Sequence, residues 1–315
     1  MRLDDLPDSG NIEDRRGDSY GGGGGGFGGI PMGGGGLGIG TVVILGLIGW
    51  ALGIDPTLLI SGADQLSRRS APVEQPGSRQ PGTRQSGTPS DEMGRFVSRV
   101  LGSTETTWKT IFSKEGKSYR TPTLILYNGV TRAACGGQAQ AAMGPFYCPV
   151  DQKVYLDTSF FRELQTRFRG CDGKACQFAQ AYVIAHEIGH HVQNQLGILQ
   201  RAQQLQQAAG GKAQANAIQV RVELQADCLA GVWASFENQR LRNEGKPAFI
   251  EPGDVEAALR TAAAIGDDTL QKRSQGYAVP DSFTHGSSAQ RQRWFENGYK
   301  GGTVASCNTF AAAQL

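Results

Sequence analysis

The sequence predicts an α+β domain, mainly helical with a small sheet, preceded by a single transmembrane helix. An uncharged apolar run over residues 37–54 indicates the membrane helix. Short segments rich in β-branched and aromatic residues, gathered between residues 123 and 157, indicate a few strands. Apolar residues recur at three- and four-residue steps through long segments, mostly beyond residue 158, and this period indicates amphipathic helices.

Residues 1–36 are predicted to be a disordered tail, because their many glycines cannot bury enough apolar surface to offset the entropy lost on ordering. No strand-like segment precedes these glycines, so they do not fit a nucleotide-binding loop. Residues 61–90 are predicted to be an extended linker, since they are rich in proline, glycine, serine and arginine. The folded domain is expected over residues 91–315.

The apolar run at residues 37–54 is predicted to anchor the chain in a lipid bilayer. As a helix it would reach about 27 Å, near the lower limit for crossing a hydrocarbon core, and apolar residues up to 60 can extend it. A cleaved signal peptide fits less well, because the run begins far from Met1 and no A-x-A-like site follows it. A buried core helix is the other alternative, and the glycine-rich approach argues against it.

Charge and cysteine content bear on partners and compartment. The formal net charge is only +2, and no basic stripe with interleaved aromatic residues indicates a nucleic-acid partner. All six cysteines lie beyond residue 134, which favours disulfides in an oxidising compartment over free thiols in a cytosolic domain. Flanking charges do not decide the orientation of the anchor, so the cysteines place the N-terminus in the cytoplasm and the domain outside. The expected pairs are Cys135 with Cys148, Cys171 with Cys176, and Cys228 with Cys307.

Within the domain, strands and helices are assigned from residue pattern and period. The predicted strands are residues 123–127 and 131–135 and a hairpin over 144–157. The predicted helices are residues 91–113, with a break at Gly102, and 158–168, 177–196, 213–243 and 252–265.

The helix at residues 177–196 contains His186-Glu187-Ile188-Gly189-His190, an H-E-x-x-H pattern. Helical residues four apart share one face, so His186 and His190 can offer nitrogens to one metal ion. Zinc suits such a site because it binds nitrogen and oxygen ligands and keeps a position open. Glu187 is placed to take a proton from water that the metal activates. The alternative is a helix whose histidines are merely hydrogen-bonded and whose glutamate is solvated.

A zinc ion held by two histidines needs a further protein ligand, and Glu223 is the candidate. Glu223 and Asp227 lie four residues apart in an apolar stretch of the 213–243 helix, where buried carboxylates need partners. We expect Asp227 to hydrogen-bond the second ring nitrogen of a metal-binding histidine, preferably His186. A solvated carboxylate pair is one alternative. Cys228 as a ligand is another, and it is less favoured than a disulfide.

His285 is the only histidine outside the metal helix. It lies in the segment THGSSAQR at residues 284–291, which leads into a predicted helix. Its imidazole could donate a hydrogen bond to a tetrahedral oxyanion. A surface histidine or a contact at the start of the helix is the alternative.

Taken together, these motifs resemble the bacterial putative neutral zinc metallopeptidase family, over about residues 91–310. The matching features are the N-terminal anchor, ACGGQ at 134–138, GPFYCPVDQKVYLD at 144–157, HEIGHH at 186–191, ELQAD at 223–227 and THGSSAQR at 284–291. The resemblance implies a zincin-like fold in which E-x-x-x-D supplies the third zinc ligand, as in gluzincins. The T-H-G-x-x-x-x-R segment is also similar to the histidine-bearing element of membrane-associated zinc peptidases. The family does not fix a substrate.

The resulting hypothesis is a zinc-dependent endopeptidase anchored in the bacterial inner membrane. Its catalytic domain would be periplasmic or otherwise extracytoplasmic and would cleave peptide or protein substrates. Zn²⁺ would be bound by His186, His190 and Glu223, while Glu187 and His285 would be catalytic. One alternative is a non-catalytic, zinc-stabilised envelope scaffold or chaperone-like binding protein with the same ligands. Another is a regulator that faces the cytosol and carries six reactive thiols.

Overall fold

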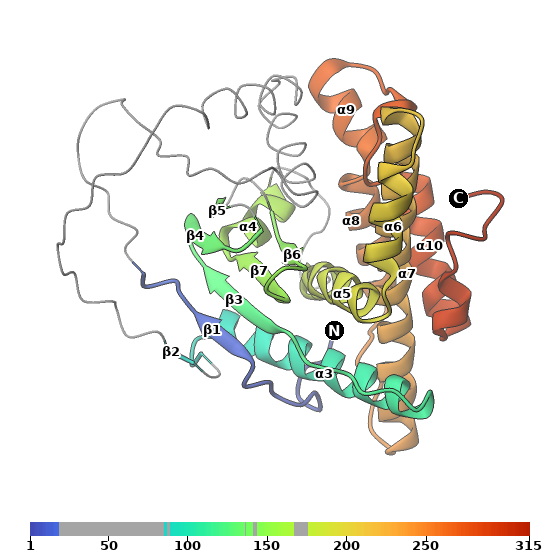
Figure 1. Cartoon of the computed structure of the whole chain (residues 1–315). Helices are drawn as coiled ribbons and strands as arrows, with labels where there is room; N and C mark the ends of the chain where they lie inside the picture. Colours follow the sequence, from blue (N-terminus) through green and yellow to red (C-terminus); the bar gives the residue numbers. More distant parts are fainter. Residues whose placement is uncertain (19–84, 87–88, 136, 141–143, 167–175) are drawn as a thin grey trace, which may run out of the picture.

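The computed structural model describes residues 1–18, 85–86, 89–135, 137–140, 144–166 and 176–315 (Figure 1). These residues form a mainly helical domain with a small mixed sheet. The strands are β1 (Ile12–Asp14), β2 (Gln85–Ser86), β3 (Thr123–Tyr127), β4 (Val130–Ala133), β5 (Gly137–Gln140), β6 (Phe146–Cys148) and β7 (Lys153–Asp157). The helices are α3 (Glu92–Lys114), α4 (Ser159–Thr166), α5 (Cys176–Gln195), α6 (Ile198–Gln207), α7 (Lys212–Asn243), α8 (Asp254–Ala264), α9 (Asp267–Gln275) and α10 (Ser288–Gly301), with 3₁₀ turns η3 (Pro280–Ser282) and η4 (Val304–Cys307).

The main sheet has five strands in the order β2-β1-β3-β7-β6. β1, β3 and β7 are parallel, whereas β2 and β6 pair antiparallel at the two edges. The predicted hairpin at residues 144–157 is confirmed as β6 and β7, and the predicted strand at residues 123–127 is confirmed as β3. β4 and β5 form a separate antiparallel pair.

Both faces of the main sheet are covered. Because successive side chains point to opposite faces, Leu124 and Leu126 join the large core with the apolar residues of α3 and α5. Ile125 and Tyr127 form a smaller cluster on the other face, with Cys148 and Tyr155. The sheet therefore has buried side chains on both faces, and its edge strand β6 contacts α5.

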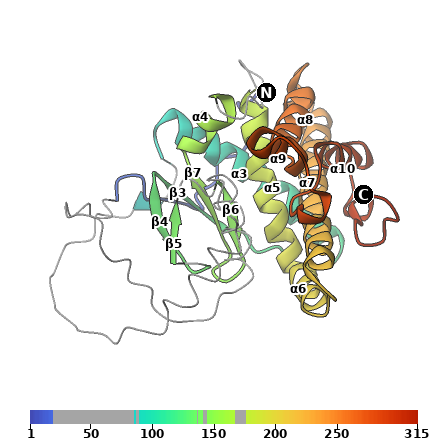
Figure 2. The same ribbon diagram turned by 90° about the horizontal axis from the view of Figure 1, so that it is seen from above.

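Helix α5 lies between the sheet and α7, and α10 packs on the far side of α7 (Figures 1 and 2). The contact between α7 and α10 depends on two glycines. A Cβ atom at Gly298 would stand 1.8 Å from the carbonyl oxygen of Cys228, and one at Gly231 would stand 2.2 Å from that of Phe295. Only glycine permits this approach of the two backbones.

The prediction of a disordered tail over residues 1–36 is wrong for residues 1–18, which belong to the domain. β1 lies between β2 and β3, and Met1, Leu6 and Ile12 contribute to the large core. The glycine-rich part of the tail, residues 19–36, lies outside the described residues. A pattern of three strand residues among charged ones carries too little periodicity to reveal a strand that is formed by pairing with distant partners.

The break predicted at Gly102 is also wrong, because α3 continues through it. The glycine serves a different purpose. A Cβ atom there would stand 2.2 Å from the carbonyl oxygen of Pro7, so the missing side chain makes room for the N-terminal segment to cross the helix.

Two of the three predicted disulfides, Cys135–Cys148 and Cys228–Cys307, are confirmed. The third predicted pair includes Cys171, which lies outside the described residues. No helix in the described part of the chain combines the length and apolar character needed to cross a bilayer. The predicted anchor at residues 37–60 lies outside that part, as does the predicted linker at 61–90 except for β2 and residues 89–90.

Replacing Ile12 with alanine should lower the free energy of unfolding by about 2–4 kcal/mol, because this core side chain is only 1% exposed. Val150→Ala is a matched control: Val150 is 71% exposed, and its loss should change stability by less than about 0.5 kcal/mol. Denaturant unfolding of the purified variants measures both. Equal stability of Ile12→Ala and the parent would show that the N-terminal segment does not contribute to the core.

Candidate metal centre

Helices α5 and α7 pack against each other and carry the predicted metal-site residues. These are His186, Glu187 and His190 on α5, and Glu223 and Asp227 on α7. The two helices approach closely at Gly189, where a Cβ atom would stand 3.0 Å from the carbonyl oxygen of Ala226 and 3.1 Å from its Cα. Glycine at this position therefore allows a carboxylate of α7 to reach the imidazoles of α5.

The three predicted ligands meet at one point. Nε2 of His186 lies 3.3 Å from Oε2 of Glu223, and Nε2 of His190 lies 3.5 Å from the same oxygen. Two ligand atoms bound about 2.1 Å from a tetrahedral zinc ion stand about 3.4 Å apart, so both distances suit a shared zinc ion. All three ligand atoms lie within 4.8 Å of one another. His186, His190 and Glu223 can therefore hold a metal ion.

The electrostatics of the centre favour a cation. Burial raises the pKa of Glu223, but His190 and His186 outweigh it and hold that pKa well below its usual range. Burial lowers the pKa of His186, whereas Asp227 and Glu223 raise it, and the resulting pKa is about 10. The buried carboxylates thus stabilise positive charge at this point, which is the condition that a divalent ion requires.

Asp227 makes the contact expected of it. Its Oδ1 lies 2.8 Å from Nδ1 of His186, so a proton on Nδ1 is donated to the carboxylate and Nε2 is left to face Glu223. Asp227 is itself held by two charge-assisted hydrogen bonds of 2.8 Å from the guanidinium of Arg291, and by one of 2.6 Å from the hydroxyl of Tyr182. Arg291 and Tyr182 therefore fix the carboxylate that orients the first imidazole.

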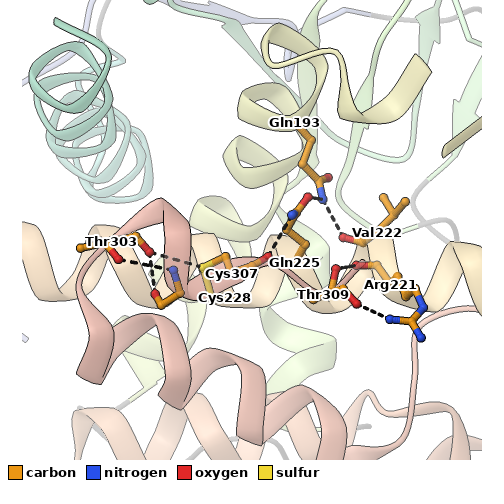
Figure 3. The surroundings of a disulfide bond; sticks show 9 residues. Gln193, Arg221, Val222, Gln225, Cys228, Thr303, Cys307 and Thr309 are labelled. Carbon is orange, nitrogen blue, oxygen red and sulfur yellow. Dashed lines mark hydrogen bonds between the residues drawn. A yellow bond between two sulfur atoms is a disulfide. The ribbon is translucent and has the colours of Figure 1, made fainter. Parts of the chain in front are cut away.

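A second chain of contacts orients His190. Its Nδ1 lies 2.9 Å from Oε1 of Gln193, whose amide donates to the carbonyl oxygen of Val222 at 2.8 Å and to Oε1 of Gln225 at 2.9 Å. Gln225 donates in turn to the carbonyl oxygen of Cys307 at 2.9 Å (Figure 3). This glutamine relay, Gln193 and Gln225, joins the second imidazole to the residue that forms the disulfide with Cys228.

Glu187, the predicted acid–base residue, is 7% exposed on the helix face next to the ligands. Burial raises the pKa of Glu187 above its usual value, against the opposing effect of the two imidazoles. The backbone of Tyr147 in β6 acts on this carboxyl group and lowers its pKa slightly. The carboxyl group is thus buried and electrostatically coupled to the three predicted ligands.

His285 lies on the loop before α10, and this loop packs on α7. A Cβ atom at Gly286 would contact Val220 at 3.3 Å and Leu224 at 3.1 Å, and these residues bracket Glu223 on α7. Burial lowers the pKa of His285, but Asp267 and Glu223 raise it above the ordinary value. The structure therefore brings His285 close enough to the metal-site carboxylate to be coupled to it electrostatically.

Asp267 holds this loop in place. Its Oδ2 accepts hydrogen bonds from the backbone amides of Thr284, His285 and Gly286, at 2.7, 2.6 and 3.0 Å. Its Oδ1 lies 3.4 Å from Nδ1 of His285. One carboxylate at the start of α9 thus fixes both the backbone and the ring of the candidate oxyanion donor.

His191, adjacent to the motif, points away from the centre. Its Nδ1 lies 3.0 Å from the hydroxyl of Tyr147, and its Nε2 lies 2.6 Å from the carbonyl oxygen of Arg120. It ties α5 to the sheet side of the domain, as its position about 100° around the helix from His190 suggests.

Sequence reasoning assigned no role to Arg291, Tyr182, Gln193, Gln225 or Asp267. Arg291 and Gln193 had usable signals: Arg291 lies in the THGSSAQR segment, and Gln193 follows His190 by three residues on the same helical face. Asp267 had none, because its partners lie 17–19 residues away in a loop.

A family model described as "Putative neutral zinc metallopeptidase" matches residues 1–310. The chain belongs to this family. It is 46% identical over 312 residues to the uncharacterized protein YpfJ of Escherichia coli K12, covering 98% of this chain and 99% of YpfJ. It is 44% identical over 231 residues to the uncharacterized proteins Mb2605 of Mycobacterium bovis and Rv2575 of Mycobacterium tuberculosis, covering 71% of this chain and 74% of each relative. No solved structure matches the chain.

The match confirms the family expected from the sequence motifs, and it extends to the N-terminal segment. The family's name agrees with the residue types that meet at the centre, two histidines and one glutamate. Zinc is therefore the ion to test first at this site.

Replacing Glu223 with glutamine should lower zinc affinity at least about tenfold, because the amide keeps the shape of the side chain but removes the anionic ligand oxygen. Zinc content after dialysis and competition with a chromophoric chelator measure the loss. Glu244→Gln, at the C-terminal end of the same helix, is the matched control and should bind zinc as the parent does. Unchanged affinity in Glu223→Gln would remove this residue from the ligand set.

Replacing Gln193 with methionine should weaken zinc binding by about 10-fold to 100-fold, since the length of the side chain is kept but the acceptor that orients His190 is lost. Gln203→Met, at an exposed position on α6, is the control and should leave the affinity unchanged. Isothermal titration with Zn²⁺ into the apo-protein gives both values. Parent-like affinity for Gln193→Met would mean that the relay supports only the fold.

Proposed function

We propose that the domain is a zincin-like, zinc-dependent endopeptidase. The observation that carries this proposal is the convergence of His186, His190 and Glu223 at zinc-binding distances with the buried carboxyl of Glu187 beside them. A purely structural zinc site has four protein ligands, whereas a catalytic site has three and leaves a position for water or substrate. The three ligands found here, with an adjacent general base, match the catalytic arrangement.

Zinc held by His186, His190 and Glu223 would supply a Lewis acid for the activation of water and the polarisation of the scissile carbonyl. Glu187 accepts a proton from the attacking water and delivers it to the departing amine. Burial of its carboxyl group beside the two imidazoles places it for both transfers. The raised pKa of Glu187 suits a group that must carry the proton between the two steps.

His285 is proposed to stabilise the oxyanion that develops on the scissile carbonyl. Its coupling to Glu223 and its rigid support by Asp267 favour this role over that of a loose surface histidine. A donor held in place before the reaction costs little reorganisation when charge develops.

The sheet supports an extended peptide as the substrate. β6 is an edge strand that pairs with β7 on one side, and the described strands leave its other side unpaired. β6 contacts α5, and the hydroxyl of Tyr147 within it lies 3.0 Å from Nδ1 of His191 in α5. A peptide that pairs with this edge by β-augmentation would therefore run beside the proposed catalytic residues.

The proposal also includes the compartment, the membrane contact and the kind of partner. The two disulfides support a domain that matures outside the cytoplasm, and the uncharged run at residues 37–54 supports contact with a lipid bilayer. The near-neutral net charge supports a protein rather than a nucleic acid as the partner. A zinc-stabilised scaffold remains the rival function, since its ligands would be the same.

Replacing Glu187 with glutamine separates the two functions. Peptide hydrolysis, followed with casein or a quenched fluorescent peptide library, should fall by at least about 100-fold, because the proton acceptor is lost. Zinc content should stay at the parent level, since Glu187 is not a ligand. Glu115→Gln, at the exposed end of α3, is the control and should retain full activity.

Removal of zinc with a chelator should abolish the same hydrolysis, and added Zn²⁺ should restore it. Parent-like hydrolysis by the zinc-loaded Glu187→Gln variant would contradict the peptidase mechanism. A zinc-loaded parent that cleaves none of these substrates, yet unfolds when zinc is removed, would favour the scaffold.

A further inference from the structure

The first eighteen residues bear on membrane topology, because they are built into the domain that carries the metal centre. β1 is an interior strand, with Glu13 opposite Ile125 of β3 on one side and opposite Ser86 of β2 on the other. Backbone hydrogen bonds between the two strands continue past the ends of β1. The amide of Arg15 donates to the carbonyl oxygen of Leu126 at 2.7 Å, and the amide of Leu124 donates to the carbonyl oxygen of Asn11 at 2.9 Å. Removing β1 from the domain would therefore break its pairing with both β2 and β3.

Contacts outside the sheet hold the same segment. The side chains of Ser9 and Asn11 donate to Oε1 of Glu105 in α3, at 2.6 and 2.8 Å. The guanidinium of Arg15 is 8% exposed and donates to the hydroxyl of Thr131 at 3.3 Å and to the carbonyl oxygen of Arg132 at 3.1 Å. The N-terminal segment thus contacts α3, β3 and β4 with polar groups that are satisfied by the domain.

The chain returns to the place from which it leaves. Asp14, at the end of β1, pairs with Gln85 of β2. The guanidinium of Arg16 donates to the carboxylate of Asp14 and to that of Asp91, and Asp91 is the N-cap of α3. Residues 16 and 91 are therefore neighbours, although the whole predicted anchor and linker separate them in the sequence.

These contacts are incompatible with one passage through a membrane between β1 and β2. Paired strands lie about 4.8 Å apart, whereas the hydrocarbon core of a bilayer is about 30 Å thick. A single crossing would put the two strands on opposite sides and would remove β1 from the sheet. Any path through the bilayer must return to the side from which it started.

We propose that the N-terminal segment, residues 1–18, and the metal centre lie on the same, extracytoplasmic side of the membrane. The confirmed disulfides supply the assignment of the side. This topology differs from the single-pass arrangement expected from the sequence, in which the N-terminus lies in the cytoplasm. It does not depend on the proposed peptidase activity.

Labelling of single added cysteines tests the topology in the full chain. Asp4 and Lys300 are suitable positions, since their side chains are 85% and 73% exposed, one in the N-terminal segment and one on α10. Asp4→Cys and Lys300→Cys should react equally with a membrane-impermeant maleimide in intact spheroplasts, and lysis should add no further labelling. The parent chain, without an added cysteine, is the background control.

Labelling of Asp4→Cys only after lysis, with Lys300→Cys labelled before it, would establish a single crossing and overturn the proposal. Labelling of both positions only after lysis would overturn the extracytoplasmic assignment.

An intramolecular crosslink tests the same contact independently. Glu13 and Ser86 are Cα partners in the antiparallel β1–β2 pair, and paired strands bring Cα atoms to about 4.5–5.5 Å, within the range that a disulfide spans. The double variant Glu13→Cys, Ser86→Cys should form a crosslink in membranes, seen as a reductant-sensitive mobility shift, and each single variant should not. A double variant that binds zinc like the parent but forms no crosslink would overturn the proposal.

Discussion

The close approach of α5 and α7 is the constraint on which the metal centre depends. Gly189 has no side chain to hold Ala226 away, so the two backbones meet where the histidines and Glu223 face one another. A methyl group there would have to displace the backbone of α7 by a few tenths of an ångström. Ligand distances of 3.3 and 3.5 Å leave little room for such a shift. The spacing of the helices therefore fixes the geometry of the ligands.

Around this contact, each imidazole is held by a different support. His186 depends on Asp227, Arg291 and Tyr182, which bring α10 into the centre. The second imidazole depends on the glutamine relay, which reaches η4 and its disulfide. A buried charged cluster and a chain of neutral amides thus perform the same task. The first is strong because its partners are charged, whereas the second is specific because each amide has a single arrangement that satisfies all of its partners.

Local sequence patterns predicted the parts of the structure that local forces determine. The H-E-x-x-H and E-x-x-x-D spacings place side chains on one helical face, so the ligands could be named from the helical period alone. The hairpin of β6 and β7 and the long helix α7 followed from residue pattern in the same way. The disulfides of Cys135 and Cys228 were also predicted correctly.

Other features formed by distant partners, in contrast to the Cys228–Cys307 disulfide, could not be read from the sequence. β1 is only three residues long and lies next to a glycine-rich stretch, so its identity comes from β3, more than a hundred residues away. Gly102 looked like a helix break, but it is the point where Pro7 crosses α3. Asp267 serves a loop whose amides are identified only once the chain is folded. In each case the structural role of the residue depends on a contact with a part of the chain that is distant in the sequence.

The residues that support the two imidazoles are synthesised later than the helices that carry the ligands. Arg291 and Cys307 follow α7 in the sequence, and both support imidazoles carried by a helix made much earlier. A nascent chain of 290 residues has all of α5 and α7 but neither of these supports. Both supports of the centre are therefore in place only after residue 307 has left the ribosome, well after the two helices that carry the ligands.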